Sequence, residues 1–182
     1  NGLPERLREG FRIAELGFGT GLNMLALAIA AGGTPLRFTS FEAFPMAAPD
    51  IARALAAFPE AEAIAAPFLV AWEAGRTRFT VGSVDVEVIP GDARTALPNW
   101  QGRADAWFLD GFSPAKNPEL WDAGLMGAVA AHTAPGGTFA TYTAAGHVRR
   151  ALQSAGFAVT RLQGYGGKRH MSAGRLASCE AT

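Results

Sequence analysis

The chain has 182 residues, of which 49% are hydrophobic and 18% charged, so it is long enough for one domain, tight for two, and not disordered. No apolar run approaches the roughly 18–20 residues of a membrane span and no export leader is recognisable, so we expect a cytoplasmic protein without membrane contact. Sixteen basic and sixteen acidic residues give no net charge, which taken alone argues against nucleic acid as a partner.

Short apolar runs alternate with helix-like stretches along the chain, which is typical of an α/β protein with a mostly parallel, Rossmann-like sheet. Strands are expected at residues 11–16, 36–41, 78–81, 84–89, 105–109, 138–143, 157–162 and 170–176. Helices are expected at residues 22–31, 49–58, 118–132 and 146–155, and the Ala-rich stretch 61–66 is left unassigned. Gly82-Ser83 predicts a hairpin, and Pro135-Gly136-Gly137 comes after the third helix. We therefore expect a single domain, with helices on both faces of the sheet and an antiparallel C-terminal strand.

A glycine-rich turn joins the first strand to the first helix, and it contains Gly17, Gly19 and Gly21. Glycines let backbone N–H groups approach a ligand closely, with the helix N-terminus behind them. The spacing is G-x-G-x-G after an acid, Glu15, and differs from the G-x-G-x-x-G of dinucleotide-binding enzymes. An acid here repels a pyrophosphate and favours the cationic end of S-adenosylmethionine. We therefore expect Glu15, the three glycines and Asn23, in the first turn of the helix, to bind this cofactor.

Three more acids follow strands, and the carboxyl ends of parallel strands meet at one crevice. Glu42 ends the second strand and is expected to accept hydrogen bonds from ribose hydroxyls. Asp92 and Ala93 follow the strand at 84–89 and are expected to receive the adenine amino group, and Asp110 ends the next strand beside them. Each acid taken singly is as well explained as a helix or loop cap. The set, in register with the glycine turn, indicates a class I S-adenosylmethionine-dependent methyltransferase.

One loop and several shorter motifs resemble those of a known enzyme family. The segment Phe108-Leu109-Asp110-Gly111-Phe112-Ser113-Pro114-Ala115-Lys116-Asn117-Pro118, followed by Trp121, resembles the signature loop of the MnmC methyltransferases, which modify the wobble uridine of tRNA. Further similarity lies at residues 1–6, 41–45, 139–146 and 164–169, so it extends over the whole chain. The chain departs from the family pattern at Leu7, where a tryptophan is usual, and at Ala43, where a basic residue is usual.

The resemblance implies methyl transfer from S-adenosylmethionine to the exocyclic amine of 5-aminomethyl(-2-thio)uridine in tRNA, which gives the 5-methylaminomethyl form. The family's N-terminal segment and the oxidase domain that some members carry are not expected within residues 1–182. A separate enzyme is therefore expected to supply the aminomethyl uridine.

Side chains in and near the signature loop are the candidates for catalysis. Asp110 is expected to accept a hydrogen bond from the substrate nitrogen and orient it, and whether it also takes the proton is left open. Phe112 and Tyr142 either stack on the flipped base or are core aromatics. Lys116 and Asn117 either contact phosphate and ribose or fix the loop through hydrogen bonds.

The charges are unevenly distributed along the chain. Residues 1–110 hold nine basic and thirteen acidic residues, whereas residues 111–182 hold seven basic and three acidic ones. The pairs Arg149-Arg150 and Lys168-Arg169 are expected to flank the crevice and to neutralise tRNA phosphates, although such a cluster by itself is more often a solvated face.

Three other functions are alternatives to tRNA methylation. They are a methyltransferase acting on a small-molecule amine, a non-catalytic nucleotide-binding module, and a nicotinamide oxidoreductase, which the glycine spacing and Glu15 disfavour. No metal is expected, because His132, His147 and His170 lack metal-ligand spacing and Cys179 is the single cysteine.

Overall fold

A computed structural model describes residues 2–111, 113–164, 167 and 169–177. Its strands are β1 Phe11–Leu16, β2 Leu36–Glu42, β3 Arg78–Val81, β4 Val84–Pro90, β5 Ala104–Leu109, β6 Thr133–Thr141, β7 Phe157–Gln163 and β8 His170–Leu176. Its α-helices are α1 Leu22–Ala31, α2 Ala48–Leu55, α3 Glu62–Glu73, α4 Ala93–Asn99, α5 Ala123–Ala131 and α6 Gly146–Ser154. Short 3₁₀ helices lie at Pro4–Arg6, Pro59–Ala61 and Pro118–Trp121. None of the described helices is long and apolar enough to cross a membrane.

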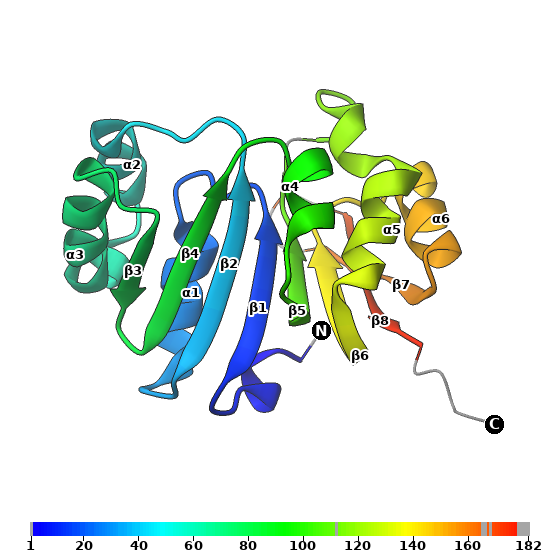
Figure 1. Cartoon of the computed structure of the whole chain (residues 1–182), viewed down its shortest axis with the longest axis horizontal. Coiled ribbons are helices and arrows are strands. Elements are labelled where there is room, and N and C mark those ends of the chain that lie inside the picture. The colour runs from blue at the N-terminus through cyan, green and yellow to red at the C-terminus, as the bar shows by residue number, and fades with distance from the viewer. Residues whose placement is uncertain (1, 112, 165–166, 168, 178–182) are drawn as a thin grey trace.

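The described strands form one sheet in the order β3-β4-β2-β1-β5-β6-β8-β7 (Figure 1). Strands β4, β2, β1, β5 and β6 are parallel, whereas β3 is antiparallel to β4, and β8 is antiparallel to both β6 and β7. The prediction of a mostly parallel sheet with an antiparallel C-terminal strand is confirmed. The chain moves outwards from β1 through β2 to β4, and from β5 to β6 on the other side. The carboxyl ends of β1 and β5 therefore flank the switch point at which such sheets bind ligands.

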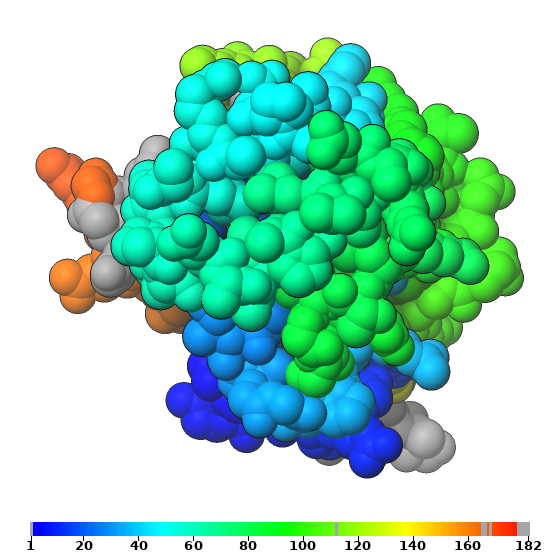
Figure 2. Space-filling model, turned by 90° about the vertical axis from the view of Figure 1, so that its left-hand side faces the viewer, coloured from blue at the N-terminus to red at the C-terminus, as the bar shows by residue number. Residues whose placement is uncertain are grey.

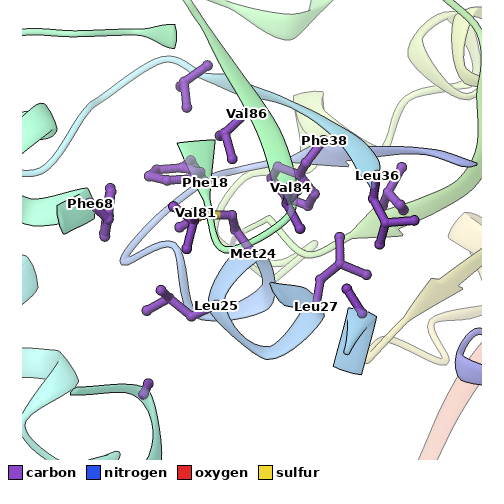
Figure 3. Close-up of a cluster of buried hydrophobic side chains, with 14 of the residues drawn as sticks. Phe18, Met24, Leu25, Leu27, Leu36, Phe38, Phe68, Val81, Val84 and Val86 are labelled. Carbon is purple, nitrogen blue, oxygen red and sulfur yellow. The ribbon is translucent and has the colours of Figure 1, made fainter. Parts of the chain in front are cut away.

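Helices pack on both faces of the sheet, as predicted. Alternate residues of β1 serve the two faces: Phe11 and Ile13 belong to the cluster under α1 and α3, and Ala14 and Leu16 to the cluster under α4, α5 and α6. The first cluster includes the buried side chains Phe18, Met24, Leu25, Phe38, Phe68, Val84 and Val86 (Figure 3). The second cluster includes Leu97, Trp107, Met126, Phe139 and Leu152. Helices α2 and α3, cyan to teal in Figure 2, cover one end of the molecule beyond β3.

The single helix predicted at residues 118–132 is wrong, because the structure divides it. Pro118–Trp121 forms a 3₁₀ helix, and α5 begins after Asp122, whose Oδ1 accepts a hydrogen bond of 2.7 Å from the Leu125 N–H. This N-cap starts a new helix with its own axis. The strand predicted to start at Thr138 begins earlier, at Thr133, so Pro135, Gly136 and Gly137 lie within β6. They interrupt its ladder with β5, where Ala104 pairs with Thr133 but Ala106 pairs with Thr138.

Two helices were not predicted. In α3 a proline, Pro67, weakens the helical signal, yet Phe68 of the same helix is fully buried and packs edge-on against Phe18. In α4 the helix is short and contains Pro98, and it begins at the cap formed by Asp92. Two predicted ends are also displaced: α2 ends before 58, and β6 ends before 143.

Candidate functional site

The glycine-rich turn passes between the carboxyl ends of β2 and β5. The Gly17 N–H donates to the Phe41 carbonyl oxygen at 2.9 Å, and a Cβ on Gly17, whose φ is +89°, would lie 3.3 Å from the Asp110 carbonyl oxygen. Only glycine lets the turn approach β5 this closely. Gly21, with φ +73°, is the N-cap of α1. Gly19, with φ +53°, has nothing within 4 Å of where a Cβ would stand, so the turn is open on that side.

Glu15 lies beneath this turn and is buried on the α1 face of β1. Its Oε2 accepts a hydrogen bond of 2.8 Å from the Ser40 hydroxyl, and its Oε1 accepts one of 2.8 Å from the Asn23 side-chain amide. Burial raises the pKa of Glu15 to about 8, the negative charges of Asp110 and Glu42 act in the same direction, and the two hydrogen bonds oppose them. Glu15 therefore carries a proton at neutral pH unless a cation comes close to it.

Asn23 joins the buried acid to the exposed one. The same Nδ2 donates to Glu15 Oε1 and to Asp110 Oδ2, each at 2.8 Å. Two carboxyl groups are thereby held around one amide at the switch point between β1 and β5. The sequence analysis assigned Asn23 to the cofactor from its place in the first turn of the helix, but it did not predict the bridge to Asp110.

Glu42 connects the glycine turn to the segment that follows β2. Its Oε2 accepts a hydrogen bond of 3.0 Å from the Gly19 N–H, and its Oε1 accepts one of 2.8 Å from the Phe44 N–H. Each carboxylate oxygen keeps a further lone pair for a ligand hydroxyl. Phe44 itself is 79% exposed, an exposed aromatic side chain that the sequence analysis did not single out.

Asp92 is placed differently from the other three acids. Its Oδ1 accepts hydrogen bonds from the Arg94 backbone N–H at 2.9 Å and from Arg94 Nε at 3.1 Å, and it is the N-cap of α4. These hydrogen bonds, with the charge of Arg94, lower the pKa of Asp92. Ala93, the first residue of α4, is buried. Asp92 thus serves as a helix cap, and the structure does not link it to Glu15, Asn23 or Asp110.

A pocket of about 320 Å³ opens beside Asp110. Its polar groups come from Asn23, Asp110, Thr141 and Tyr142, and its apolar walls come from Phe108, Ala140 and Met171. The Tyr142 hydroxyl donates to the Gly111 carbonyl oxygen at 2.7 Å. Burial, with the negative charge of Asp110, raises the pKa of Tyr142. Sequence reasoning missed Thr141, Met171 and the apolar walls, because β8 reaches this edge only through its pairing with β6.

The loop after Asp110 is held by its own backbone. The N–H groups of Lys116 and Asn117 both donate to the Ser113 carbonyl oxygen, at 2.8 and 3.0 Å. The Lys116 side chain is exposed and Asn117 is half-buried. Phe112 and Lys168 lie outside the described residues.

The topology brings the described basic candidates to this same edge. Arg169 comes just before β8, and because β8 is antiparallel to β6, it lies near the carboxyl end of β6. The Gly164 N–H donates a hydrogen bond of 3.2 Å to the Arg169 carbonyl oxygen. Arg149 and Arg150 lie in the first half of α6, which follows β6. Arg150 is exposed, whereas Arg149 is half-buried and its Nε has no hydrogen-bond acceptor within the described part of the chain.

The chain is similar in sequence to a known protein family and to curated relatives. Residues 57–177 match a family model described as S-adenosyl-L-methionine-dependent methyltransferase. The chain is 44% identical over 178 residues to the tRNA 5-methylaminomethyl-2-thiouridine biosynthesis bifunctional protein MnmC of Chromobacterium violaceum, an alignment that covers 92% of this chain. The chain spans only 27% of that relative's length.

Two solved structures illustrate the likeness in fold. MnmC2 from Aquifex aeolicus is 25% identical, with a TM-score of 0.66 over 96% of this chain and 55% of that one. CalS10 of Micromonospora echinaspora, an amino pentose methyltransferase with S-adenosylmethionine bound, is 15% identical, with a TM-score of 0.56 over 95% of this chain and 88% of that one. The second likeness concerns the fold alone.

Proposed function

The chain belongs to the family of S-adenosyl-L-methionine-dependent methyltransferases, and on that premise we propose that it methylates the exocyclic amine of 5-aminomethyl(-2-thio)uridine at the wobble position of tRNA. The product is the 5-methylaminomethyl form. The observation that carries this proposal is the bridge from Glu15 through Asn23 to Asp110 beside a pocket with apolar walls. It places a buried acid for a cationic cofactor next to an exposed acid for an amine.

The residues around the glycine turn suit S-adenosylmethionine. The open backbone at Gly19 admits a ligand, the buried Glu15 favours a positive charge, and Glu42 retains acceptor capacity for a ribose diol. We assign Gly17 and Gly21 to shaping the turn. Asp92 and Ala93 are assigned to the adenine end, where the Asp92 carboxylate, which accepts four hydrogen-bond contacts from Arg94, exchanges one of them for the adenine amino group. When bound, the cofactor supplies a methyl group already activated on a sulfonium.

The chain's own task is to orient the amine and to take up its proton. An alkylammonium has no lone pair, so the substrate nitrogen must be held as the neutral amine, and the methylated nitrogen must give up one proton. The Asp110 carboxylate is exposed beside the pocket, and one of its oxygens is fixed by Asn23. We assign Asp110 to accepting a hydrogen bond from the nitrogen, which aligns the lone pair. Phe108 and Met171 give the pocket apolar walls, and Tyr142, which also lines it, is a candidate to wall the base. Phe112 is the second candidate.

The RNA is proposed to cross the edge where Arg149, Arg150 and Arg169 lie. Together with Lys116 and Lys168 they supply charges for backbone phosphates, and Asn117 a polar contact. Such a protein acts where tRNA is modified, in the cytoplasm. An activity outside residues 1–182 has to supply the aminomethyl group.

Methyl transfer to tRNA lacking the methyl group tests the proposal, with free alkylamines as the competing substrates. Transfer to the tRNA alone supports it, whereas transfer to free amines alone supports the small-molecule alternative, and cofactor binding without transfer supports a non-catalytic module.

The role of Asp110 is tested by substitution. Asp110→Ala is expected to lower kcat by about 10²–10⁴-fold, the contribution of a positioned acid or base, while the Kd for S-adenosylhomocysteine changes little. Asp50→Ala, which removes an exposed carboxylate on α2, is the matched control and is expected to retain activity. An equal loss of turnover and of cofactor binding in Asp110→Ala would assign Asp110 to the cofactor instead of the amine.

A further inference from the structure

A second cavity, of about 480 Å³, lies on the sheet face away from Phe108 and below α4. Helix α4 ends at Asn99, and the lower parts of β1, β2 and β4 have no described helix in front of them in Figure 1. Arg12 and Arg37 line the cavity from this uncovered part of the sheet. Trp100 and Arg103, which lie between α4 and β5, line its side. Arg12 precedes Glu15 by three residues, about 10 Å along the strand, so the cavity is separate from the crevice.

The register of the sheet concentrates positive charge here. Arg12 of β1 lies directly beside Arg37 of β2, an arrangement of like charges that costs stability unless it is compensated. Arg12 is compensated on its other side, where its Nε lies 3.1 Å from Asp105 Oδ2 and its backbone N–H donates to the same oxygen at 2.9 Å. Arg37 has no such partner: it is exposed and forms no ion pair within the described ranges.

Among the described residues, the acids near the cavity form no ion pair with Arg37 or Arg103. Glu87, its one acidic lining residue among those described, is occupied by Arg78, whose Nε donates to Glu87 Oε1 at 2.9 Å. Asp85 pairs with Arg37 in register but accepts its hydrogen bond from Thr80, at 3.4 Å, and is not ion-paired to Arg37. Arg103 is exposed and, in the part of the chain that the structure describes, has no ion pair either. Two guanidinium groups are therefore available to bind an anion in a cavity that a third one lines.

The lining favours an oxyanion such as a phosphate over a simple halide. Guanidinium groups present planar pairs of donors that match the oxygens of a phosphate, and they are less strongly hydrated than ammonium groups. Thr39 adds a hydroxyl donor to the lining and the partly buried Trp100 an aromatic wall, on which a base or ribose next to the phosphate can pack.

We propose that this cavity binds a phosphate group, and that the phosphate comes from the backbone of the RNA substrate. The assignment to RNA rests on the proposed function, whereas the phosphate site itself does not. An RNA bound in both places runs from the crevice past α4 onto the α4 side of the sheet. The more acidic part of the chain then contributes a phosphate contact, in addition to the basic residues after 110.

The test removes the two unpaired charges with Arg37→Gln and Arg103→Gln in one variant of the whole chain. The matched control is Arg53→Gln with Arg76→Gln, which removes two exposed arginines outside the cavity. For tRNA lacking the methyl group, we expect Kd and KM to be about tenfold higher in the cavity variant than in the unchanged chain at 0.1 M salt. We also expect the slope of log K against log salt to be smaller by about 1 for each phosphate that the variant no longer binds. The control is expected to change Kd less than twofold, and an unchanged Kd for S-adenosylhomocysteine shows that the cavity variant is folded.

Titration with sodium pyrophosphate separates the sources of the phosphate. Saturable binding that the cavity variant loses, together with weakened tRNA binding, supports the full proposal. Pyrophosphate binding that disappears while tRNA affinity is unchanged assigns the cavity to a free phosphate compound and overturns the RNA assignment. Unchanged binding of both overturns the proposal altogether. If the unmodified chain never methylates tRNA but still binds pyrophosphate through Arg37 and Arg103, the proposed function fails and the phosphate site stands.

Discussion

The Glu15 carboxyl is expected to lose a proton when the cofactor binds. Burial raises its pKa to about 8, so about 0.9 of the molecules carry the proton at pH 7 and about 0.1 at pH 9. The positive charge of a ligand's methionine end favours the ionised carboxylate and drives the pKa back down. Binding of S-adenosylhomocysteine, which retains the α-ammonium group, is therefore expected to release up to about 0.9 proton at pH 7, where the amine of the free ligand is already mostly protonated.

Calorimetric titration in two buffers of contrasting ionisation enthalpy measures this release. Glu15→Gln keeps the size of the side chain but cannot ionise, so it is expected to release no proton and to bind the ligand more weakly. Glu73→Gln, on the exposed end of α3, is the matched control and is expected to behave as the unchanged chain. A release below about 0.2 proton at pH 7, or a release that persists in Glu15→Gln, would refute the reasoning.

The same raised pKa has a consequence for stability. The folded chain holds the Glu15 proton up to about pH 8, whereas the unfolded chain gives it up above the ordinary value of 4.5. The unfolded state therefore binds fewer protons in this range, and the free energy of unfolding falls as the pH rises from 4.5 to 8, by about 5 kcal/mol at most. Denaturant titrations at several pH values are expected to show this decline, and Glu15→Gln is expected to flatten it.

Two further predictions concern the first turn of α1. Asn23→Ala removes the amide that lowers the pKa of Glu15, so the proton release is expected to move to higher pH. The variant is also expected to lose about 1–3 kcal/mol of stability, because a buried acceptor loses its donor. Proton release centred at the original pH would contradict the hydrogen bond between Asn23 and Glu15. Gly21→Ala places a Cβ 2.9 Å from the Phe18 ring at a φ of +73°, and is expected to lower the free energy of unfolding by about 2–4 kcal/mol. Gly19→Ala, where nothing lies within 4 Å, is expected to lower the free energy of unfolding only by the cost of the backbone conformation, about 1–2 kcal/mol. Thermal unfolding of both variants measures the difference, and equal losses would show that packing around Gly21 does not matter.

Local signals were sufficient for most strands and for the elements around the glycine turn. The strands at 11–16, 78–81 and 170–176 and the helix at 22–31 were predicted with the bounds that the structure shows. Glycines adjoin both ends of the segments 11–16 and 22–31 and the end of 78–81. The helix α3 was not predicted, because its stability comes from Phe68 packing under the turn, a contact between residues far apart in the chain. The break at Asp122 depends on one cap hydrogen bond, which competes with an otherwise continuous helical pattern.

The meeting of the four acids at one edge of the sheet follows from the sequence alone, because each lies within two residues of the carboxyl end of a strand and all parallel strands end at one edge. The chemistry of a cationic cofactor and the identity of the family could be argued from those positions. Only the tertiary structure decided which acids act together. Asn23 reaches both Glu15 and Asp110, whereas Asp92 turns to Arg94, and no spacing in the chain distinguishes these outcomes.

The meaning of the zero net charge was decided in the same way. The sequence shows the two opposed parts of the chain, but charge counted along the chain says nothing about which groups neutralise each other in space. The pairing of β1 with β2 sets Arg12 beside Arg37. Asp105 forms an ion pair with Arg12, and Glu87 forms one with Arg78, so neither acid pairs with Arg37. Local electrostatics depend on distances of a few ångströms, and those distances are fixed by strand register, which only the folded sheet defines.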